Sequence, residues 1–375
     1  MEIIKTKKYK EPFESLYKLN IGYSLDEFEA EEAMRTILLE KGLQKRTSLM
    51  TMLLNGIMVK GPTINEVSGL LTASLNMDNI LKKQKLKIKL SDKGPLVGVA
   101  SSGKKGIKTI NITTTACFVA AACGANIAKA CSHSTSSKTG SSDFLEICGI
   151  NIDIAYEKKV EILNKYHISF FSIEETTPKF AKVYGGVFYA PHAMSFGLAG
   201  LSFPVEIDSL AYGLSHPNVK LSAEVLKKFN IKNGLVYSST HDGIHYLDEL
   251  LPFGHVYFTR IKEGKVEKII STDIQNSLNL TSGFDITNIE EEIDKEKNIS
   301  TSLKILKGEG TNSQNEAICV NAAIFLLLAN KVKCLEDGYN MAKKTIVSKK
   351  VWELFLNVVE LYGGDRKKVS KLAEL

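Results

Sequence analysis

Arginine is scarce in this sequence of 375 residues: Arg35, Arg46, Arg260 and Arg366 are the only ones, so residues 47–259 contain none. Arginine is the side chain that pairs best with a carboxylate or phosphate through two parallel hydrogen bonds. An anion site within residues 47–259 must therefore use lysine, hydroxyl groups or backbone amides. The net charge of +6, supplied mostly by lysine, fits an anionic ligand and also fits weak nucleic-acid binding.

Targeting and metal-binding signals are also missing. The first residues lack the apolar stretch of about 7–15 residues that marks a signal peptide. The longest apolar runs, such as residues 317–328, are interrupted by polar side chains and are too short to span a bilayer. The six cysteines show neither CxxC spacing nor a histidine at metal-ligand spacing. These absences favour a cytoplasmic protein without membrane association, whose cysteines are mostly buried free thiols.

Residues 24–78 have the pattern of packed helices. Ser24 is followed three residues later by Glu27, and Thr63 by Glu66, which is the capping-box signature of a helix N-terminus. Gly42 ends the first of these helices, and a second covers about residues 44–58. We therefore expect a small, all-helical N-terminal domain over residues 1–90.

Strand and helix patterns alternate after residue 85. Strands are expected at 85–90, 95–101, 126–131, 168–172, 205–207, 234–237 and 256–261. Helices are expected at 112–124, 142–150, 222–228, 300–307, 314–330, 335–347 and 350–361. This alternation predicts an α/β domain over residues 91–375 with a mostly parallel central sheet. We place a hinge near residues 85–95 and expect part of 175–200 to return to the helical domain.

The first motif with chemical meaning lies in residues 97–115, VGVASSGKKGIKTINITTT. A strand runs into a glycine-containing turn and then into a helix whose start holds Asn111, Thr113 and Thr114. Helix N-termini bind anions because their first amides lack intrahelical partners and the helix dipole favours negative charge. Taken alone, the motif is equally well explained as a strand, a turn and a capped helix.

The second motif is the segment 129–143, KACSHSTSSKTGSSD, in which eight of fifteen residues are serine or threonine. Its hydroxyl groups, together with Lys129 and Lys138, offer hydrogen-bond donors and positive charge to phosphate groups. The alternative is a low-complexity turn whose serines only cap the following helix. The density of hydroxyl groups between two apolar elements favours phosphate binding.

The third motif, THDGIHYLDE at 240–249, ends in the adjacent acids Asp248 and Glu249. Mg²⁺ prefers carboxylates, waters and substrate phosphates as ligands, so an acid pair after a strand suits it. Acid pairs that merely start a surface helix are common, and this motif is a weak signal when it stands alone.

Taken together and in this order, the three motifs resemble the anthranilate phosphoribosyltransferase family. The similarity is most specific over residues 111–150, which are similar to the family's N-I-S-T-A helix and the serine-rich loop that follows it. It covers about residues 24–362. The resemblance implies transfer of phosphoribose from phosphoribosyl pyrophosphate (PRPP) to an aromatic amine with Mg²⁺. It also implies a homodimer built on the N-terminal helices.

The resemblance assigns roles residue by residue. The expected PRPP-binding residues are Ser102, Gly103, Thr109, Asn111, Thr113, Thr114, Lys129, Ser137, Lys138, Ser141 and Ser142. The expected Mg²⁺ ligands are Thr113, Asp248 and Glu249. The candidates for binding the acceptor are Ser132, His133 and His192, although a lone histidine is more often a hydrogen-bonded loop residue.

The sequence departs from the family pattern in two places. The family's pyrophosphate turn, Gly-Thr-Gly-Gly-Asp, aligns with SSGKK at 101–105, so that Lys105 stands where the family has an acid. The family's acceptor-binding arginine aligns with Val187. Because a buried carboxylate needs a charged partner, we predict that anthranilate is not the efficient acceptor.

Three functions stay open at this point. The first is a divergent phosphoribosyltransferase that uses another small-molecule acceptor. The second is a non-catalytic protein of the family that binds nucleic acid or another anion, which the net positive charge and the altered turn permit. The third is a nucleoside phosphorylase-like enzyme, because the lysines of SSGKKG are loosely similar to the phosphate turn of pyrimidine nucleoside phosphorylases.

Overall fold

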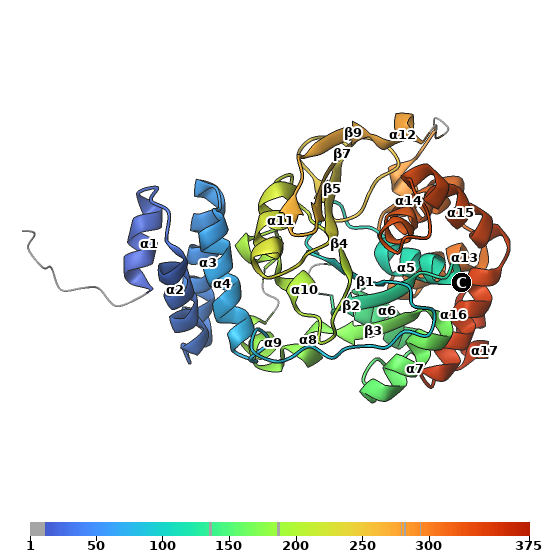
Figure 1. Cartoon of the computed structure of the whole chain (residues 1–375), viewed down its shortest axis with the longest axis horizontal. Coiled ribbons are helices and arrows are strands. Elements are labelled where there is room, and N and C mark those ends of the chain that lie inside the picture. Colours follow the sequence, from blue (N-terminus) through green and yellow to red (C-terminus); the bar gives the residue numbers. More distant parts are fainter. Residues whose placement is uncertain (1–11, 135–136, 186–187, 279, 281–282, 293) are drawn as a thin grey trace, which may run out of the picture.

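The structure is a computed structural model that describes residues 12–134, 137–185, 188–278, 280, 283–292 and 294–375 (Figure 1). The N-terminal part consists of α1 (Phe13–Asn20), α2 (Glu27–Leu39), α3 (Leu43–Lys60) and α4 (Ile64–Asn76). The remainder is a sheet with helices on both faces (Figure 1). The predicted fold class is confirmed. Within these described residues, no helix is long and apolar enough to cross a bilayer.

In the described part of the chain, nine strands form one sheet in the order β3-β2-β1-β4-β5-β7-β8, with β6 beside β5 and β9 beside β7. The pairings from β3 to β5 are parallel and the others are antiparallel, which confirms the mostly parallel sheet. The strands are β1 (Leu96–Ser101), β2 (Asn126–Cys131), β3 (Ile168–Ser172), β4 (Ser209–Gly213), β5 (Gly234–Thr240), β6 (Tyr246–Leu247), β7 (His255–Lys262), β8 (Lys265–Val266) and β9 (Ile270–Asp273).

The sheet separates two hydrophobic cores, because successive side chains of a strand point to opposite faces. In β1, Val97 and Val99 pack toward α5 (Ile112–Ala122) and the C-terminal helices, whereas Leu96 and Ala100 face the N-terminal helices. The C-terminal helices are α13 (Lys295–Lys307), α14 (Asn312–Leu328), α15 (Leu335–Val347), α16 (Lys350–Leu361) and α17 (Arg366–Leu372). The connecting elements are α6 (Ser141–Ile147), α7 (Tyr156–Tyr166), α8 (Ile173–Thr176), α9 (Pro178–Tyr184), η1 (Ala193–Phe196), α10 (Leu198–Leu201), α11 (Val219–Lys228), α12 (Ile274–Ser277) and η2 (Ile286–Ile289).

The segment from α9 to η1 joins the sheet to the helical part. Asp78, just after α4, accepts hydrogen bonds from the Lys179 and Phe180 amides at 3.0 and 2.9 Å. Ser74 of α4 donates a hydrogen bond to the sulfur of Met194 at 3.4 Å. These contacts place α9 and η1 in the same core as the N-terminal helices.

The helix predicted to start at Ser24 begins later. Asp26 is the N-cap of α2: its side chain accepts a hydrogen bond from the Glu29 amide at 2.8 Å, and Glu29 accepts one from the Asp26 amide at 3.1 Å. Aspartate caps a helix as well as serine does, so the local signal was ambiguous. The later start leaves Leu25 in the core, where it is 2% exposed. The capping box of Thr63 at the start of α4 is confirmed.

Two predicted strands are wrong. Residues 85–90 alternate lysine with apolar side chains, but their pairing in the described structure is one isolated bridge, from Leu86 to Val205. Ile88 and Leu90 are half-buried against the core of the N-terminal helices, but the segment lies beside no described strand of the sheet with which it could form a ladder. The strand predicted at 205–207 lies instead at β4, where a fully buried run pairs with both β1 and β5.

The order of the strands in the sheet reverses beside β1, where α/β proteins commonly bind ligands. The chain passes from β1 to β2 on one side of β1, whereas β4 and β5 lie on its other side. Open α/β sheets bind ligands beyond the carboxyl ends of the strands at the point where the strand order reverses. The turn at 101–105 follows β1 and lies at this point.

Candidate active site

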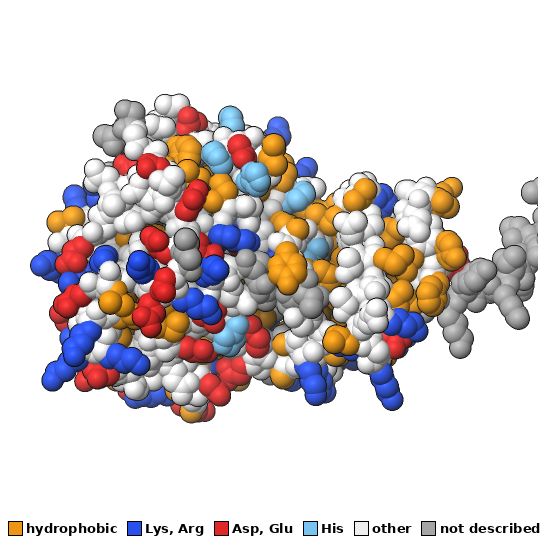
Figure 2. Space-filling view, turned by 180° about the vertical axis from the view of Figure 1, so that it is seen from behind, with side chains coloured by type: hydrophobic (Ala, Val, Ile, Leu, Met, Phe, Trp, Pro, Cys, Tyr) orange, Lys and Arg blue, Asp and Glu red, His pale blue; other side chains and the backbone are white. Residues whose placement is uncertain are grey.

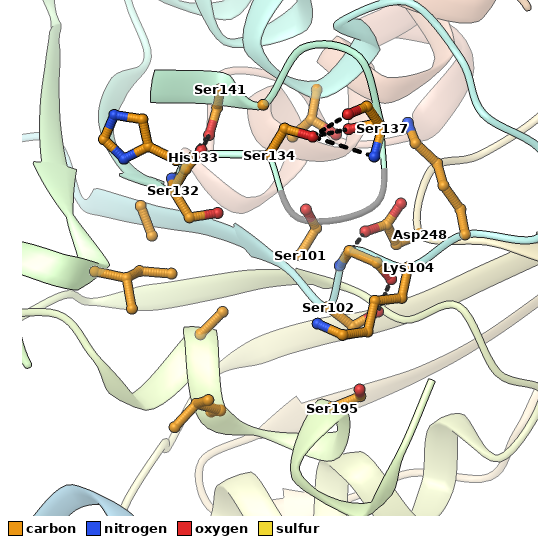
Figure 3. A pocket seen from close by; sticks show the side chains of 18 of the residues that line it. Ser101, Ser102, Lys104, Ser132, His133, Ser134, Ser137, Ser141, Ser195 and Asp248 are labelled. Carbon is orange, nitrogen blue, oxygen red and sulfur yellow. Dashed lines mark hydrogen bonds between the residues drawn. The ribbon is translucent and has the colours of Figure 1, made fainter. Parts of the chain in front are cut away.

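A cavity of about 370 Å³ lies at the carboxyl ends of β1, β2 and β3 (Figure 3). It brings together most of the residues predicted for the site. The predicted residues that line it are Ser102, Gly103, Thr109, Asn111, Thr113, Thr114, Lys129, Ser132, His133, Ser137, Ser141, His192, Asp248 and Glu249. Two predicted PRPP-binding residues are not among the lining residues. Lys138 is exposed on the outer side of its loop near Glu291, and Ser142 is fully buried.

The turn at 101–105 is held tightly between two other segments. Gly103 and Lys104 have φ angles of +65° and +58°, so two successive residues adopt the left-handed conformation and reverse the chain. The Gly103 amide donates to Asp248 Oδ2 at 2.7 Å. Ser215, after β4, donates its amide to Ser102 Oγ at 2.9 Å and its hydroxyl to the Gly103 carbonyl at 2.7 Å. Both the turn and the acid pair are thereby fixed.

The two adjacent acids, Asp248 and Glu249, are buried, and a lysine forms an ion pair with one of them. Asp248 and Glu249 are 2% and 3% exposed. The Lys105 ammonium lies 2.6 Å from Glu249 Oε1 and also donates to the hydroxyl of Thr109. Thr113 donates to the same Glu249 oxygen at 3.4 Å. The other oxygen of each carboxylate is buried and receives no hydrogen bond from any described residue.

Burial controls the protonation of this cluster. It raises the pKa of Glu249 from 4.5 to about 7; the positive charge of Lys105 opposes the rise and the Asp248 carboxylate adds to it. Burial alone would lower the pKa of Lys105, but the charges of Glu249 and Asp248 outweigh it and raise this pKa. Lys105 is therefore a permanent cation at neutral pH.

The hydroxyl-rich wall of the cavity is formed by the start of α5 and by described residues of the serine-rich segment 129–143, called the serine loop below. Asn111 is the N-cap of α5, and its side chain bonds to Thr139 of the loop, accepting from the hydroxyl at 3.2 Å. The hydroxyl groups of Thr113, Thr114 and Ser137 belong to the same wall. The first amides of α5 have no intrahelical acceptor, so this wall combines a helix N-terminus with hydroxyl donors.

Acidic side chains outside the cavity support the loop. Asp143 accepts hydrogen bonds from the amides of Ser134 and Gly140 at 2.8 and 2.7 Å. Glu291 accepts from the amides of Lys138 and Thr139. Glu291 belongs to an acid-rich segment of the sequence, IEEEIDKEK at 289–297, and its carboxylate holds the backbone of the loop. Figure 3 shows Ser132, Ser134 and Ser137 on one side of the cavity and Ser195 on the other.

Two residues predicted to bind ligands, His133 and Lys129, form hydrogen bonds with neighbouring residues of the protein. The ring of His133 is half exposed and lies 2.9 Å from Glu146 Oε1, while its amide donates to Glu174. Lys129 is buried and its ammonium donates to the carbonyl of Ala130 at 2.6 Å. His133 therefore has the hydrogen-bonded environment expected of an ordinary loop histidine.

The opposite end of the cavity is aromatic. Phe180 and Tyr184 of α9 stack with ring centroids 5.1 Å apart. The Tyr184 hydroxyl lies 2.6 Å from His192 Nε2, and the ammonium of Lys104 lies 5.7 Å from the centre of the Tyr184 ring. Met194 and Leu198 complete this apolar end, which suits a flat, largely apolar ligand group.

The ionisable groups of the aromatic end are shifted toward neutrality. Burial and the neighbouring Lys108 lower the pKa of Lys104 to about 8. Burial and the charge of Lys104 lower the pKa of His192 well below its usual value, so the imidazole is neutral. His192 Nδ1 is buried and has no hydrogen-bond partner among the described residues. A ligand in this end of the cavity would thus contact the ammonium of Lys104 and the imidazole of His192, whose Nδ1 is available for a hydrogen bond.

Several residues of the site were not predicted, among them Lys104, Lys105, Phe180, Tyr184 and Met194. Lys104 and Lys105 were recognised as a departure from the family turn, but their contacts with Tyr184 and Glu249 were not foreseen. Tyr184 lies in a segment for which the sequence predicted neither a helix nor a motif, and it therefore carried no signal. For Lys105 a signal existed: a basic residue that replaces an acid, in a chain that keeps an acid pair elsewhere, predicts that the two will pair.

Known proteins of one family match most of this chain. Residues 93–350 match the model of the glycosyl transferase family, a/b domain. The chain is 30% identical over 324 residues to the anthranilate phosphoribosyltransferase of Shewanella amazonensis, covering 84% of this chain and 88% of the relative. It is 27% identical over 353 residues to that of Methanococcoides burtonii, covering 94% of each.

Solved structures of the same enzyme share the fold. The anthranilate phosphoribosyltransferase of Thermus thermophilus superimposes with a TM-score of 0.73 at 22% identity, covering 93% of this chain and 99% of the other. The Saccharomyces cerevisiae enzyme in complex with PRPP and Mg gives a TM-score of 0.68 at 16% identity, covering 96% and 98%. The chain is thus a glycosyl transferase by class. It belongs to the anthranilate phosphoribosyltransferase family, whose members are pentosyltransferases.

Proposed function

We propose that this enzyme transfers phosphoribose from PRPP to a small-molecule acceptor other than anthranilate. The observation that carries the proposal is the division of one cavity into two ends. A helix N-terminus and serine hydroxyls line the first end, and aromatic rings line the second. Phosphates fit the first end because it offers unpaired amides and hydroxyl donors. A flat acceptor fits the second, and the two would meet beside the turn at 101–105.

In this proposal the protein acts mainly by placing the reactants and stabilising charge. As pyrophosphate leaves, negative charge grows on its oxygens and positive charge grows on the ribose ring. Fixed donors at the start of α5 and in the serine loop would stabilise the leaving pyrophosphate without having to reorganise. Asp143 and Glu291 would keep these donors in place, since they hold the loop backbone from behind.

We propose Mg²⁺ as the cofactor, bound near Asp248, Glu249 and Thr113. The residues fit a cation because Asp248 Oδ1 and Glu249 Oε2 are buried and receive no hydrogen bond from the described residues. The described part holds no group of three acidic, histidine or cysteine side chains that could bind a metal alone. Mg²⁺ keeps waters and substrate phosphates among its ligands, so in this proposal the two carboxylates and the Thr113 hydroxyl supply only the protein's share of the site. When bound, the ion would neutralise charge on the departing pyrophosphate.

The acceptor is proposed to differ from anthranilate because of the charges around the aromatic end. Among the described residues that line the cavity there is no arginine. Val187, which aligns with the family's acceptor-binding arginine, lies outside the described residues. The ammonium of Lys104 lies over the Tyr184 ring, and burial together with the neighbouring Lys108 lowers its pKa to about 8. A buried carboxylate would lack the firm bidentate partner that arginine provides.

A homodimer built on the N-terminal helices is also proposed. Figure 2 shows hydrophobic side chains gathered on the helical part of the molecule. The exposed apolar residues of this part include Phe13, Tyr17, Ile21, Tyr23, Phe28, Leu39, Leu43 and Met52. Exposed apolar surface of this kind marks an interaction site. Light scattering on a sizing column should show twice the chain mass, and Tyr17→Lys with Ile21→Lys should give monomers. A monomeric parent protein would exclude the dimer.

The transferase proposal is tested by following pyrophosphate release from PRPP and Mg²⁺ with a panel of aromatic amines and nitrogen heterocycles. Asp248→Ala with Glu249→Ala should abolish Mg²⁺-dependent turnover, since both acids face the proposed metal. Asp242→Ala removes an exposed acid from the same segment and serves as the control. Turnover that is unchanged in the double variant would rule out the metal assignment. Salt-sensitive oligonucleotide binding without any turnover would favour the non-catalytic alternative.

A further inference from the structure

The acid pair already has a positive partner that belongs to the chain. Lys105 Nζ lies 2.6 Å from Glu249 Oε1, and the two side chains are 13% and 4% exposed. The residues are 144 positions apart in the sequence and meet where the turn after β1 approaches the segment after β6. The ammonium also donates a hydrogen bond to the Thr109 hydroxyl, and the Thr113 hydroxyl donates to Glu249 Oε1. Lys105 and Glu249 therefore form a buried ion pair that neighbouring hydroxyl groups support.

The charges of this cluster are only partly balanced. Asp248 and Glu249 carry up to two negative charges, Lys105 carries one positive charge, and the Gly103 amide donates to Asp248 Oδ2 at 2.7 Å. Lys108 follows the turn after β1, and its ammonium donates a hydrogen bond to the carbonyl of Lys105 at 3.1 Å. A divalent ion that approached the remaining carboxylate oxygens would have to settle beside the Lys105 ammonium. The repulsion is strong there because the surroundings are buried and poorly screened.

We propose that Lys105 is the resident counter-ion of Asp248 and Glu249 and keeps divalent cations out of this acid pair until the phosphates of PRPP arrive. The inference deepens the proposed function, on which its PRPP part rests. In the protein without PRPP, the Lys105 ammonium supplies the positive charge that a metal ion would otherwise supply to the two carboxylates. A divalent ion then enters together with PRPP, whose phosphate oxygens add the negative charge that is missing from the pair. Lys105 is in this sense a positioning residue for the metal.

The inference is tested on the full chain without PRPP, so that it does not depend on catalysis. Mn²⁺ is the probe, and its binding is followed by calorimetry and by the loss of the free-ion paramagnetic resonance signal. Lys105→Gln should bind Mn²⁺ at least about tenfold more tightly than the parent protein, because a unit charge next to the ion is removed. Lys108→Gln removes an equal charge three residues further along the chain. That charge acts on both acids through space, so its removal should change the affinity much less than loss of the 2.6 Å ion pair of Lys105.

A further variant assigns the gain to the acid pair. Lys105→Gln combined with Glu249→Gln should lose the tight Mn²⁺ site that the single variant creates. The proposal is overturned if Lys105→Gln binds Mn²⁺ no more tightly than Lys108→Gln. It is also overturned if the parent protein already binds one Mn²⁺ as tightly as the variant. Neither result depends on transferase activity, so a failure of the proposed function is seen separately, as an absence of turnover.

Loss of folding in the variant would still give an answer. If Lys105→Gln unfolds at a lower temperature because Glu249 has lost its partner, Mn²⁺ should restore its melting temperature toward that of the parent protein. The variant that also carries Glu249→Gln should gain nothing from Mn²⁺. A destabilised Lys105→Gln that Mn²⁺ does not rescue would show that Lys105 only holds the turn in place, and would refute its role as a counter-ion for the metal site.

Discussion

Removing the carboxylate of Asp78 should loosen the aromatic wall of the cavity. Asp78 is 5% exposed, and its two oxygens accept hydrogen bonds from the amides of Lys179 and Phe180, at 3.0 and 2.9 Å. These are the first free amides of α9, because Pro178 has no N–H and Thr177 makes no side-chain cap. An aspartate from the helical part therefore caps a helix that lies a hundred residues further along the chain.

The magnitude follows from the two bonds. A hydrogen bond to a charged group contributes about 1.5–3 kcal/mol, so loss of both bonds in Asp78→Ala should lower the free energy of unfolding by about 3–6 kcal/mol. Asp78→Asn keeps one acceptor oxygen and should cost about 1–3 kcal/mol. Asp26→Ala is the matched control, because it removes an exposed helix cap far from the cavity, and it should cost about 1 kcal/mol.

Two measurements check this prediction. Urea unfolding gives the free-energy differences, and hydrogen exchange followed by mass spectrometry reports on residues 178–184. Asp78→Ala should speed exchange in α9, and Asp26→Ala should not. The reasoning is refuted if Asp78→Ala costs no more than Asp26→Ala, or if exchange in α9 stays at the level of the parent protein. Because α9 carries Phe180 and Tyr184, the same variant should also weaken binding at the aromatic end.

Ser141→Ala should weaken PRPP binding, measured by calorimetry, by about 1–3 kcal/mol. Ser142→Ala should leave this affinity unchanged, because Ser142 is buried and does not line the cavity. Equal effects of the two substitutions would argue against the serine loop as a phosphate site. Anthranilate with PRPP and Mg²⁺ should give a kcat/KM at least two orders of magnitude below about 10⁴ M⁻¹s⁻¹, and a value at or above that level in a steady-state assay would restore the plain family function. The pKa of Glu249 is about 7 in the folded protein and 4.5 in the unfolded chain, so between these pH values the folded protein holds one proton more than the unfolded chain. The free energy of unfolding should therefore fall by up to about 3 kcal/mol as pH rises through this window. Glu249→Gln should flatten that dependence in urea titrations at pH 5 to 7, although its stability is lower throughout; an unchanged slope would contradict the raised pKa.

Local sequence signals located the elements that carry the site. Thr63 with Glu66 predicted the start of α4, and the strand, turn and helix pattern of 97–115 predicted β1 and the start of α5. Such signals work because capping and alternation depend on neighbours within a few residues. They fail where two residues cap equally well, as Ser24 and Asp26 do, or where an alternating segment such as 85–90 finds no sheet to join.

By itself, the sequence determined that a hydroxyl-rich loop, a helix start and an acid pair belong to one protein, and its resemblance to a known family placed them in one site. Only the tertiary structure decided which charges touch. Lys105 meets Glu249, Lys104 lies over Tyr184, and Asp78 caps α9 because the strand order and the crossovers bring distant segments to one edge of the sheet. No local propensity encodes these contacts, since each depends on the packing of two complete elements against each other.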